Sequence, residues 1–206
     1  MKRNRLCNIL VLALCAWLFV PAYAEDSIPV YGGTQVKLDI LSPVLTPGLH
    51  QWQMQHYEVA ANVQLKHRFY PTLELGYAGG KTHNDSVQYS GQGGFARIGC
   101  DINPLKKHPD SPHAFLLGIR VGTDFQKKKT DCWGEIVAGC QVQLWEDPKS
   151  KVHGGFYMGW MGRLKILFTR EKEGLTADQM GPIYIPGFGS RGNVAWGLSY
   201  HVGWKF

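Results

Sequence analysis

Apolar and polar residues alternate with a period of two along much of this chain, which predicts β-strands with one apolar and one polar face. The pattern is strongest over 192–206, at the C-terminal end. Its even positions are large and apolar: Trp196, Leu198, Tyr200, Val202, Trp204 and Phe206. The residues between them are small or polar. This apolar face is too large for the edge of a soluble sheet.

Seven further segments repeat the alternation, and none shows a sustained helical period. Together with the last, the predicted strands are 34–42, 56–66, 72–82, 94–102, 114–125, 133–145, 155–169 and 192–206. Tilted strands of about 9–11 residues cross a bilayer, and bacterial barrels contain an even number of them. The sequence therefore predicts an all-β fold, an eight-stranded antiparallel up-and-down transmembrane β-barrel.

The lengths of the connections and the positions of aromatic residues predict how this barrel would be oriented in the membrane. Turns at 67–71, 103–113 and 146–151 would face the periplasm. Loops at 43–55, 83–93, 126–132 and 170–191, which are longer on average, would face outward. Aromatic girdles are expected near the two rims. One contains Phe69, Tyr70, Phe115, Phe156, Trp204 and Phe206, and the other contains Tyr57, Tyr77, Trp133, Phe168 and Trp196.

A secreted soluble barrel that binds a ligand, similar to a lipocalin, would also give alternating strands. The polar face distinguishes the two interpretations, because here it is rich in glycine and a soluble surface rarely exposes so many strand glycines. The glycines expected to point inward are Gly76, Gly99, Gly118, Gly122, Gly139, Gly159, Gly197 and Gly203. We therefore favour the membrane barrel, and expect Ile119→Arg on its lipid face to be more damaging than Gly118→Ser inside it.

Charged residues of both signs fall on the inward face of the predicted strands. The interior of an eight-stranded barrel is just wide enough for side chains to fill, and buried charges there must be paired. The expected lumen charge network is Glu58, Glu74, Arg97, Asp101, Arg120, Asp124, Glu135, Arg163 and Lys165. It predicts a salt-bridged, largely plugged lumen, with a narrow solute pore lined by charged rings as the alternative.

The N-terminal end has the features of an export signal. Positive charges over 1–5 precede a short apolar run and the site Ala22-Tyr23-Ala24, so we expect a signal peptide at 1–24 and an outer-membrane barrel domain at 25–206. The formal net charge of +6 falls to +3 when the three charged residues of the signal leave. Without a basic stripe, the composition gives no indication of nucleic-acid binding.

No catalytic or metal-binding pattern stands out. Ser199 and His201 share the inward face, but there is no Gly-x-Ser-x-Gly elbow, so we expect no enzyme and leave a lipid-modifying enzyme as the alternative. His108, Asp110 and His113 share one turn, where a solvated turn is favoured over a metal site. The odd number of cysteines, 5, argues against a disulfide framework. Neither cofactor nor metal is expected.

Three sequence segments resemble those of a known protein family. They are HYEVAANVQLKHRFYPTLELGYAGGKT from His56, FLLGIRVGTDF from Phe115 and FYMGWMGRLK from Phe156. With them the chain resembles a small uncharacterised outer-membrane β-barrel family of Bacteroides-type bacteria, and this resemblance implies fold and location only. The strand ending on Phe206 also resembles the terminal strand of outer-membrane barrels, which implies recognition by the outer-membrane assembly machinery.

These observations lead to an expected role. We expect a monomer in the outer membrane, in contact with its lipids and lipopolysaccharide, with a structural or surface-interaction role through the outer loops. The longest loop, 170–191, combines exposed aromatic groups with Gly and Pro. Tyr184 and Phe188 are its candidate interaction residues, either for a partner or for covering the barrel mouth.

Overall fold

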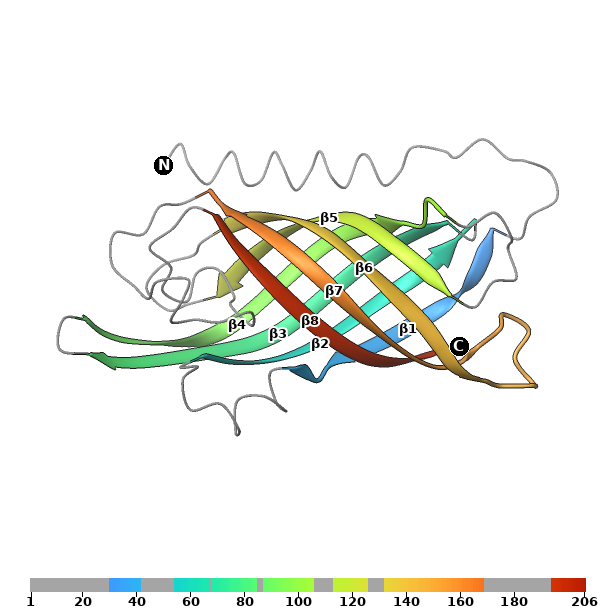
Figure 1. Ribbon diagram of the computed structural model, residues 1–206, viewed down its shortest axis with the longest axis horizontal. Helices are drawn as coiled ribbons and strands as arrows, with labels where there is room; N and C mark the ends of the chain where they lie inside the picture. The colour runs from blue at the N-terminus through green and yellow to red at the C-terminus, as the bar shows by residue number, and fades with distance from the viewer. Residues whose placement is uncertain are drawn as a thin grey trace.

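The computed structural model describes residues 30–41, 54–66, 68–84, 87–105, 113–125, 132–168 and 194–206. They form one closed antiparallel barrel in which every strand pairs with its neighbours in the sequence (Figure 1). The strands are β1 Tyr31–Asp39, β2 Met54–Leu65, β3 Phe69–Asn84, β4 Val87–Ile102, β5 Ala114–Phe125, β6 Cys132–Glu146, β7 Gly155–Leu167 and β8 Val194–Lys205. The predicted eight-stranded up-and-down architecture is confirmed, while 1–24 lies outside the described residues.

The barrel closes where β1 pairs with β8. This contact is the shortest in the sheet, from Gln35↔Lys205 to Asp39↔His201. A register shift between Tyr31 and Thr34 bends β1 near its start, where Gly33 has a φ of 115°. Glycine adopts this left-handed conformation without steric cost, and a β-bulge uses it to turn the strand.

The connection between β3 and β4 corrects one expectation. The segment 83–93 is not a long loop, because β3 continues to Asn84 and β4 begins at Val87, with these two residues paired. The glycines of this segment suggested a loop, but both backbones are fully engaged in the ladder. The resulting hairpin projects beyond the other strands (Figure 1). We call this end of the barrel the loop end, and the end with the β6–β7 turn and Phe206 the turn end.

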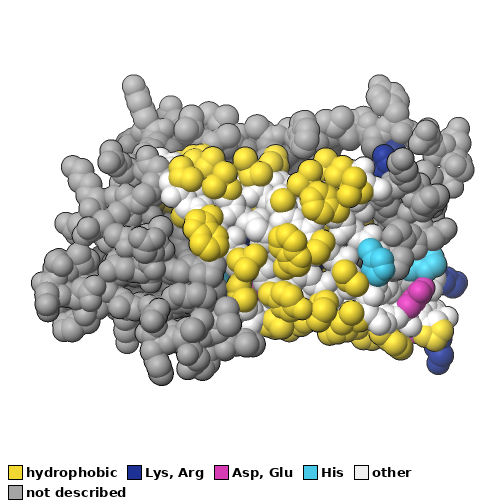
Figure 2. Space-filling view, in the orientation of Figure 1, with side chains coloured by type: hydrophobic (Ala, Val, Ile, Leu, Met, Phe, Trp, Pro, Cys, Tyr) yellow, Lys and Arg dark blue, Asp and Glu magenta, His cyan; other side chains and the backbone are white. Residues whose placement is uncertain are grey.

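Large apolar side chains cover the outside of the barrel. Outward residues in mid-strand are about half exposed, such as Leu75 at 48%, Ile119 at 42% and Leu164 at 43%. Figure 2 shows apolar side chains over the middle of one face, with the visible charged groups toward one end. No helix in the described ranges is long and apolar enough to span a membrane.

Two residues expected in the aromatic girdles point inward instead. Tyr70 is 2% exposed and Trp133 is fully buried at 0%. Both belong to the inward parity of their strands, because Tyr70 lies two residues before Thr72 and Trp133 two before Glu135. Alternation along a strand outweighs the tendency of aromatic residues to gather at a rim.

Inward glycines make space for large inward side chains on the neighbouring strand. Gly76 is paired with Phe95, and Gly122 is paired with Trp133. A methyl group on either glycine would overlap the opposite ring. Each pair therefore places an aromatic ring over a bare stretch of backbone, which lets bulky groups fit inside a narrow barrel.

The same geometry corrects the proposed comparison of Ile119 with Gly118. Gly118 is paired with Asp101, and a side chain there would overlap the Asp101 carboxylate. Gly118→Ser is therefore expected to be damaging although the position faces inward. The effect of Gly118→Ser therefore does not show whether position 118 faces the inside or the outside of the barrel.

The interior is not uniformly polar. One buried apolar cluster consists of Tyr70, Ala114, Leu116, Val137 and Met161. Leu116 and Val137 are each 1% exposed. This cluster packs part of the lumen as a core, beside the charged residues that occupy the rest.

Candidate functional site: the charged barrel interior

All nine residues of the predicted network are buried inside the barrel. Their exposed fractions range from 0% for Asp101 and Asp124 to 7% for Glu58 and Arg163. They come from six strands, β2 to β7, and alternation alone directs them inward. The side-chain direction predicted for Glu58, Glu74, Arg97, Asp101, Arg120, Asp124, Glu135, Arg163 and Lys165 is therefore correct.

Two arginines each contact the same three glutamates. Arg163 lies 3.2 Å from Glu58, 2.9 Å from Glu74 and 3.1 Å from Glu135. Arg97 lies 3.3 Å from both Glu74 and Glu135, and it also pairs with Glu58. Because β7 is adjacent to neither β2 nor β3, the contacts of Arg163 with Glu58 and Glu74 cross the lumen.

Arg120 extends the network along the barrel. Its guanidinium binds both carboxylate oxygens of Asp101, at 2.7 and 2.9 Å, and Nε donates to Glu74 Oε1 at 2.7 Å. A planar guanidinium matches a carboxylate in this two-bond geometry, which fixes orientation as well as charge. Glu74 thus contacts all three arginines and is the centre of the cluster.

Neighbouring polar and aromatic groups hold the charged side chains in place. Trp133 Nε1 donates to Glu135 Oε1 at 2.7 Å, and Arg163 Nε donates to Ser199 Oγ at 3.2 Å. The Arg97 guanidinium lies 4.9 Å from the centre of the Phe95 ring, a cation–π distance. The glycine opposite each ring is therefore also part of the support for the network.

A small cavity lies beside the network in the described part of the barrel. One cavity of about 20 Å³ is lined by Asp39, Glu58, Glu74, Arg163 and His201 among others. Roughly 10–15 Å³ of such space, counted at the centre of a water-sized sphere, is needed to hold one water molecule. The cavity is therefore of the size of a water site and too small for an organic ligand.

Several buried polar residues were not identified as site residues from the sequence. Asp39, His56 and His201 are 8%, 3% and 6% exposed and lie on the inward parity of β1, β2 and β8. Parity could have identified Asp39 and His56 as inward residues, but the register of β1 against β2, which brings them together, could not be read from the sequence. Ser199 accepts a hydrogen bond from Arg163 and donates one to the Met161 carbonyl oxygen, so it helps to hold the Arg163 side chain in place.

Other candidates from the sequence fall elsewhere. Tyr184 and Phe188 lie outside the described residues, as do His108 and Asp110, while His113 is exposed at the start of β5. Among the described cysteines, Cys100 and Cys140 have free thiols, and Cys132 Sγ donates to Thr123 Oγ1 at 3.8 Å.

The comparisons with known proteins identify a family without an assigned activity. No curated protein and no solved structure is detectably similar to the chain. Residues 5–131, more than half of the sequence, match a family described as a domain of unknown function, DUF6048. The chain belongs to this DUF6048 family.

Proposed function

We propose that this protein is an outer-membrane β-barrel whose lumen is plugged by its charge network, and that it has a structural or surface-interaction role. The observation that carries the proposal is the inverted distribution of polarity. Buried charged side chains occupy a large part of the interior, while apolar side chains cover the outside. A soluble protein is expected to have the opposite arrangement.

The outer surface supports a lipid environment. Exposed apolar residues occur on all eight strands, and include Leu38, Val59, Leu73, Leu117, Ile136, Trp160 and Trp196. Contiguous apolar patches of more than a few hundred Å² are rare on soluble monomers and mark contact with a membrane or partner. A band that encircles a closed barrel fits a bilayer, which surrounds the protein on all sides.

The interior argues against a soluble ligand-binding barrel. A lipocalin-like protein encloses a cavity for one small ligand, whereas this lumen contains side chains from opposite walls in contact with one another. Arg163 and its partners Glu58 and Glu74 cross the lumen and would obstruct ion flow. We therefore favour a plugged barrel over a narrow pore.

The proposed partners follow from the location. Outer-membrane lipids and lipopolysaccharide would surround the apolar band. Phe206, 61% exposed at the end of the chain, would be read by the outer-membrane assembly machinery. The Phe206 backbone is fixed by reciprocal hydrogen bonds with Thr34, at 2.8 and 3.2 Å. We propose no enzymatic activity.

Membrane fractionation tests the location. The protein should appear in the outer-membrane fraction and migrate faster in gels when it is not boiled, as a folded barrel does. A soluble periplasmic pool whose mobility does not change on boiling would refute the membrane assignment.

Single-channel recording tests the plug. The purified barrel in planar bilayers should show no steady open conductance, and a charge-balanced double variant, Glu74→Ala with Arg163→Ala, should show one. Arg68→Ala, at an exposed position in the β2–β3 turn, is the matched control and should stay closed. A steady conductance of the unmodified protein would favour the narrow pore instead.

A further inference from the structure

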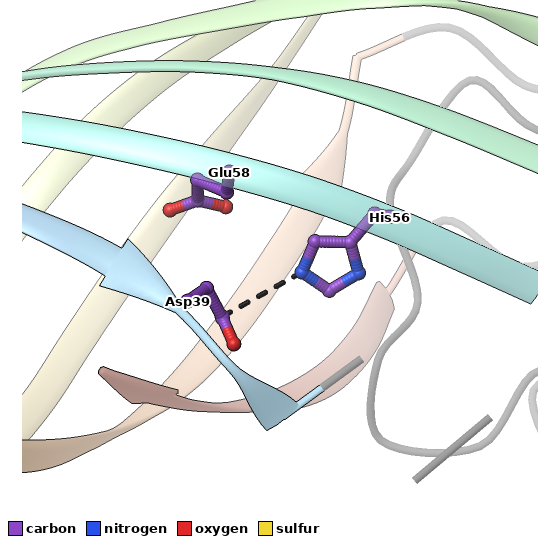
Figure 3. A group of neighbouring side chains, drawn as sticks. All are labelled: Asp39, His56 and Glu58. Carbon is purple, nitrogen blue, oxygen red and sulfur yellow. Dashed lines mark ion pairs between the residues drawn. The ribbon is translucent and has the colours of Figure 1, made fainter. Parts of the chain in front are cut away.

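A second cluster of polar side chains lies toward the loop end of the interior. Asp39 ends β1 and is paired with Glu58 on β2, and His56 precedes Glu58 by two residues on the same inward face (Figure 3). One ligand atom from each of these three residues lies within 4.8 Å of the other two. The side chains of His56 and Asp39 are 4% and 3% exposed. Three possible metal ligands are therefore gathered away from solvent.

The Asp39 carboxylate is incompletely satisfied. Its Oδ1 accepts a hydrogen bond from the Leu41 backbone N–H at 2.8 Å. Its Oδ2 is buried without a hydrogen-bond donor, and His56 Nε2 lies 3.6 Å from it. This distance is longer than an N–H···O hydrogen bond. A buried carboxylate oxygen without a donor calls for an explanation, and a bound cation is one.

The charge balance also favours a cation. Among the described residues, the buried carboxylates outnumber the buried Lys and Arg by six to five. The arginines bind Glu58, Glu74, Asp101 and Glu135, whereas the one ion pair of Asp39 is with His56. The described ion pairs of Asp39 therefore include no arginine, and the residue lies beside an imidazole that can bind metal in its neutral form.

The adjoining cavity supplies a position for a water ligand. Asp39 and Glu58 line the cavity of about 20 Å³ described above. His201 also lines it, and its buried Nε2 has no hydrogen-bond partner. A water molecule in this cavity could bind a metal ion and hydrogen-bond to His201. Three protein ligands and one water form a common four-coordinate zinc site.

We propose that Asp39, His56 and Glu58 bind a divalent transition-metal ion, with zinc as the best-fitting species. Two carboxylates and one imidazole suit zinc better than Mg²⁺ or Ca²⁺, which prefer all-oxygen sites. Bonds of about 2.1 Å set neighbouring ligand atoms roughly 3–4 Å apart. The 3.6 Å between Asp39 and His56 already fits, and the other separations need to shorten by at most about 1 Å to reach this range. The proposal does not depend on the membrane location.

Zinc binding to the full-length, metal-stripped protein in detergent tests the proposal. Isothermal titration with ZnCl₂ should give one site per chain, and zinc should raise the unfolding temperature. Asp39→Asn and His56→Gln keep side-chain volume and should each weaken this binding at least tenfold, while circular dichroism verifies that the barrel remains folded. Co²⁺ should give the visible absorption of a four-coordinate site in the unmodified protein only.

An exposed histidine outside the proposed site serves as the control. His153 lies in the β6–β7 turn with a 53% exposed side chain, next to Glu146. His153→Gln should leave zinc affinity and the Co²⁺ spectrum unchanged. The proposal is overturned if the unmodified protein binds no zinc, or if Asp39→Asn and His56→Gln bind it as tightly as the unmodified protein. Asp39 and His56 would then form an ion pair only.

Discussion

Replacing Glu74 by Gln tests how much the interior network stabilises the barrel. Glu74 contacts Arg97 at 3.3 Å, Arg120 at 2.7 Å and Arg163 at 2.9 Å, and is 2% exposed. Removing one partner of a buried ion pair typically costs about 3–5 kcal/mol. All three arginines retain another carboxylate in Glu74→Gln, because Arg120 still binds Asp101 and the other two still bind Glu58 and Glu135. We therefore expect about 3 kcal/mol, the lower end of that range.

Urea unfolding of the refolded barrel, followed by tryptophan fluorescence, measures this change. The matched control is Glu146→Gln, which breaks an ion pair of 2.7 Å with His153 in which both side chains are about half exposed. Exposed pairs contribute about 0–1 kcal/mol, so this variant should unfold close to the unmodified protein. The reasoning is refuted if Glu74→Gln loses no more stability than Glu146→Gln.

A double-mutant cycle shows whether the effect comes from the pair contact itself. Arg163→Met alone leaves Glu74 with two arginines, and Glu74→Gln alone leaves Arg163 with two glutamates. The double variant should lose less than the sum of the two single losses, by about 0.5–3 kcal/mol, as contacting residues do. Additive losses would mean that Glu74 and Arg163 act independently.

Two other substitutions test the packing and the outer face. Gly122→Ala should destabilise the barrel by about 1–3 kcal/mol, because its methyl group would overlap the Trp133 ring, whereas Gly162→Ala should be close to neutral with its nearest atom at 3.6 Å. Equal unfolding midpoints for the two variants would contradict the pairing of inward glycines with rings. Ile119→Arg should cost about 2–4 kcal/mol in lipid vesicles if this outward position lies in the membrane. If Ile119→Arg gives the same yield of folded protein in vesicles as the unmodified protein, position 119 does not lie in the membrane.

The fold was predictable because one simple rule governs this sequence. Alternation determined which face each strand presents, and it located Arg97, Arg120 and Arg163 correctly inside the barrel. The girdle assignments of Tyr70 and Trp133 were wrong because aromatic type was given more weight than parity. The long β3–β4 hairpin was missed because glycines that are compatible with a paired strand were interpreted as a loop.

The partners within the site could not be derived in the same way. Parity shows that a side chain points inward, but contact depends on the stagger of one strand against the next. For this reason the sequence did not indicate that Glu74 meets three arginines, or that Asp39 meets His56. Gly118 shows the same limit, because its intolerance of a side chain depends on Asp101 of the neighbouring strand.

The measurement closest to the central claim is spin-label accessibility in lipid vesicles. Nitroxides at Leu75, Ile119 and Leu164, each on the outward face in mid-strand, are compared with one at exposed Lys149 in the β6–β7 turn, in a background with the native cysteines replaced by serine. A membrane-embedded face predicts that the three strand positions collide more with molecular oxygen than with a water-soluble nickel complex, and that Lys149 shows the reverse. If the strand positions are as accessible to the nickel complex as Lys149, the apolar face is not in lipid and the proposed outer-membrane barrel is wrong.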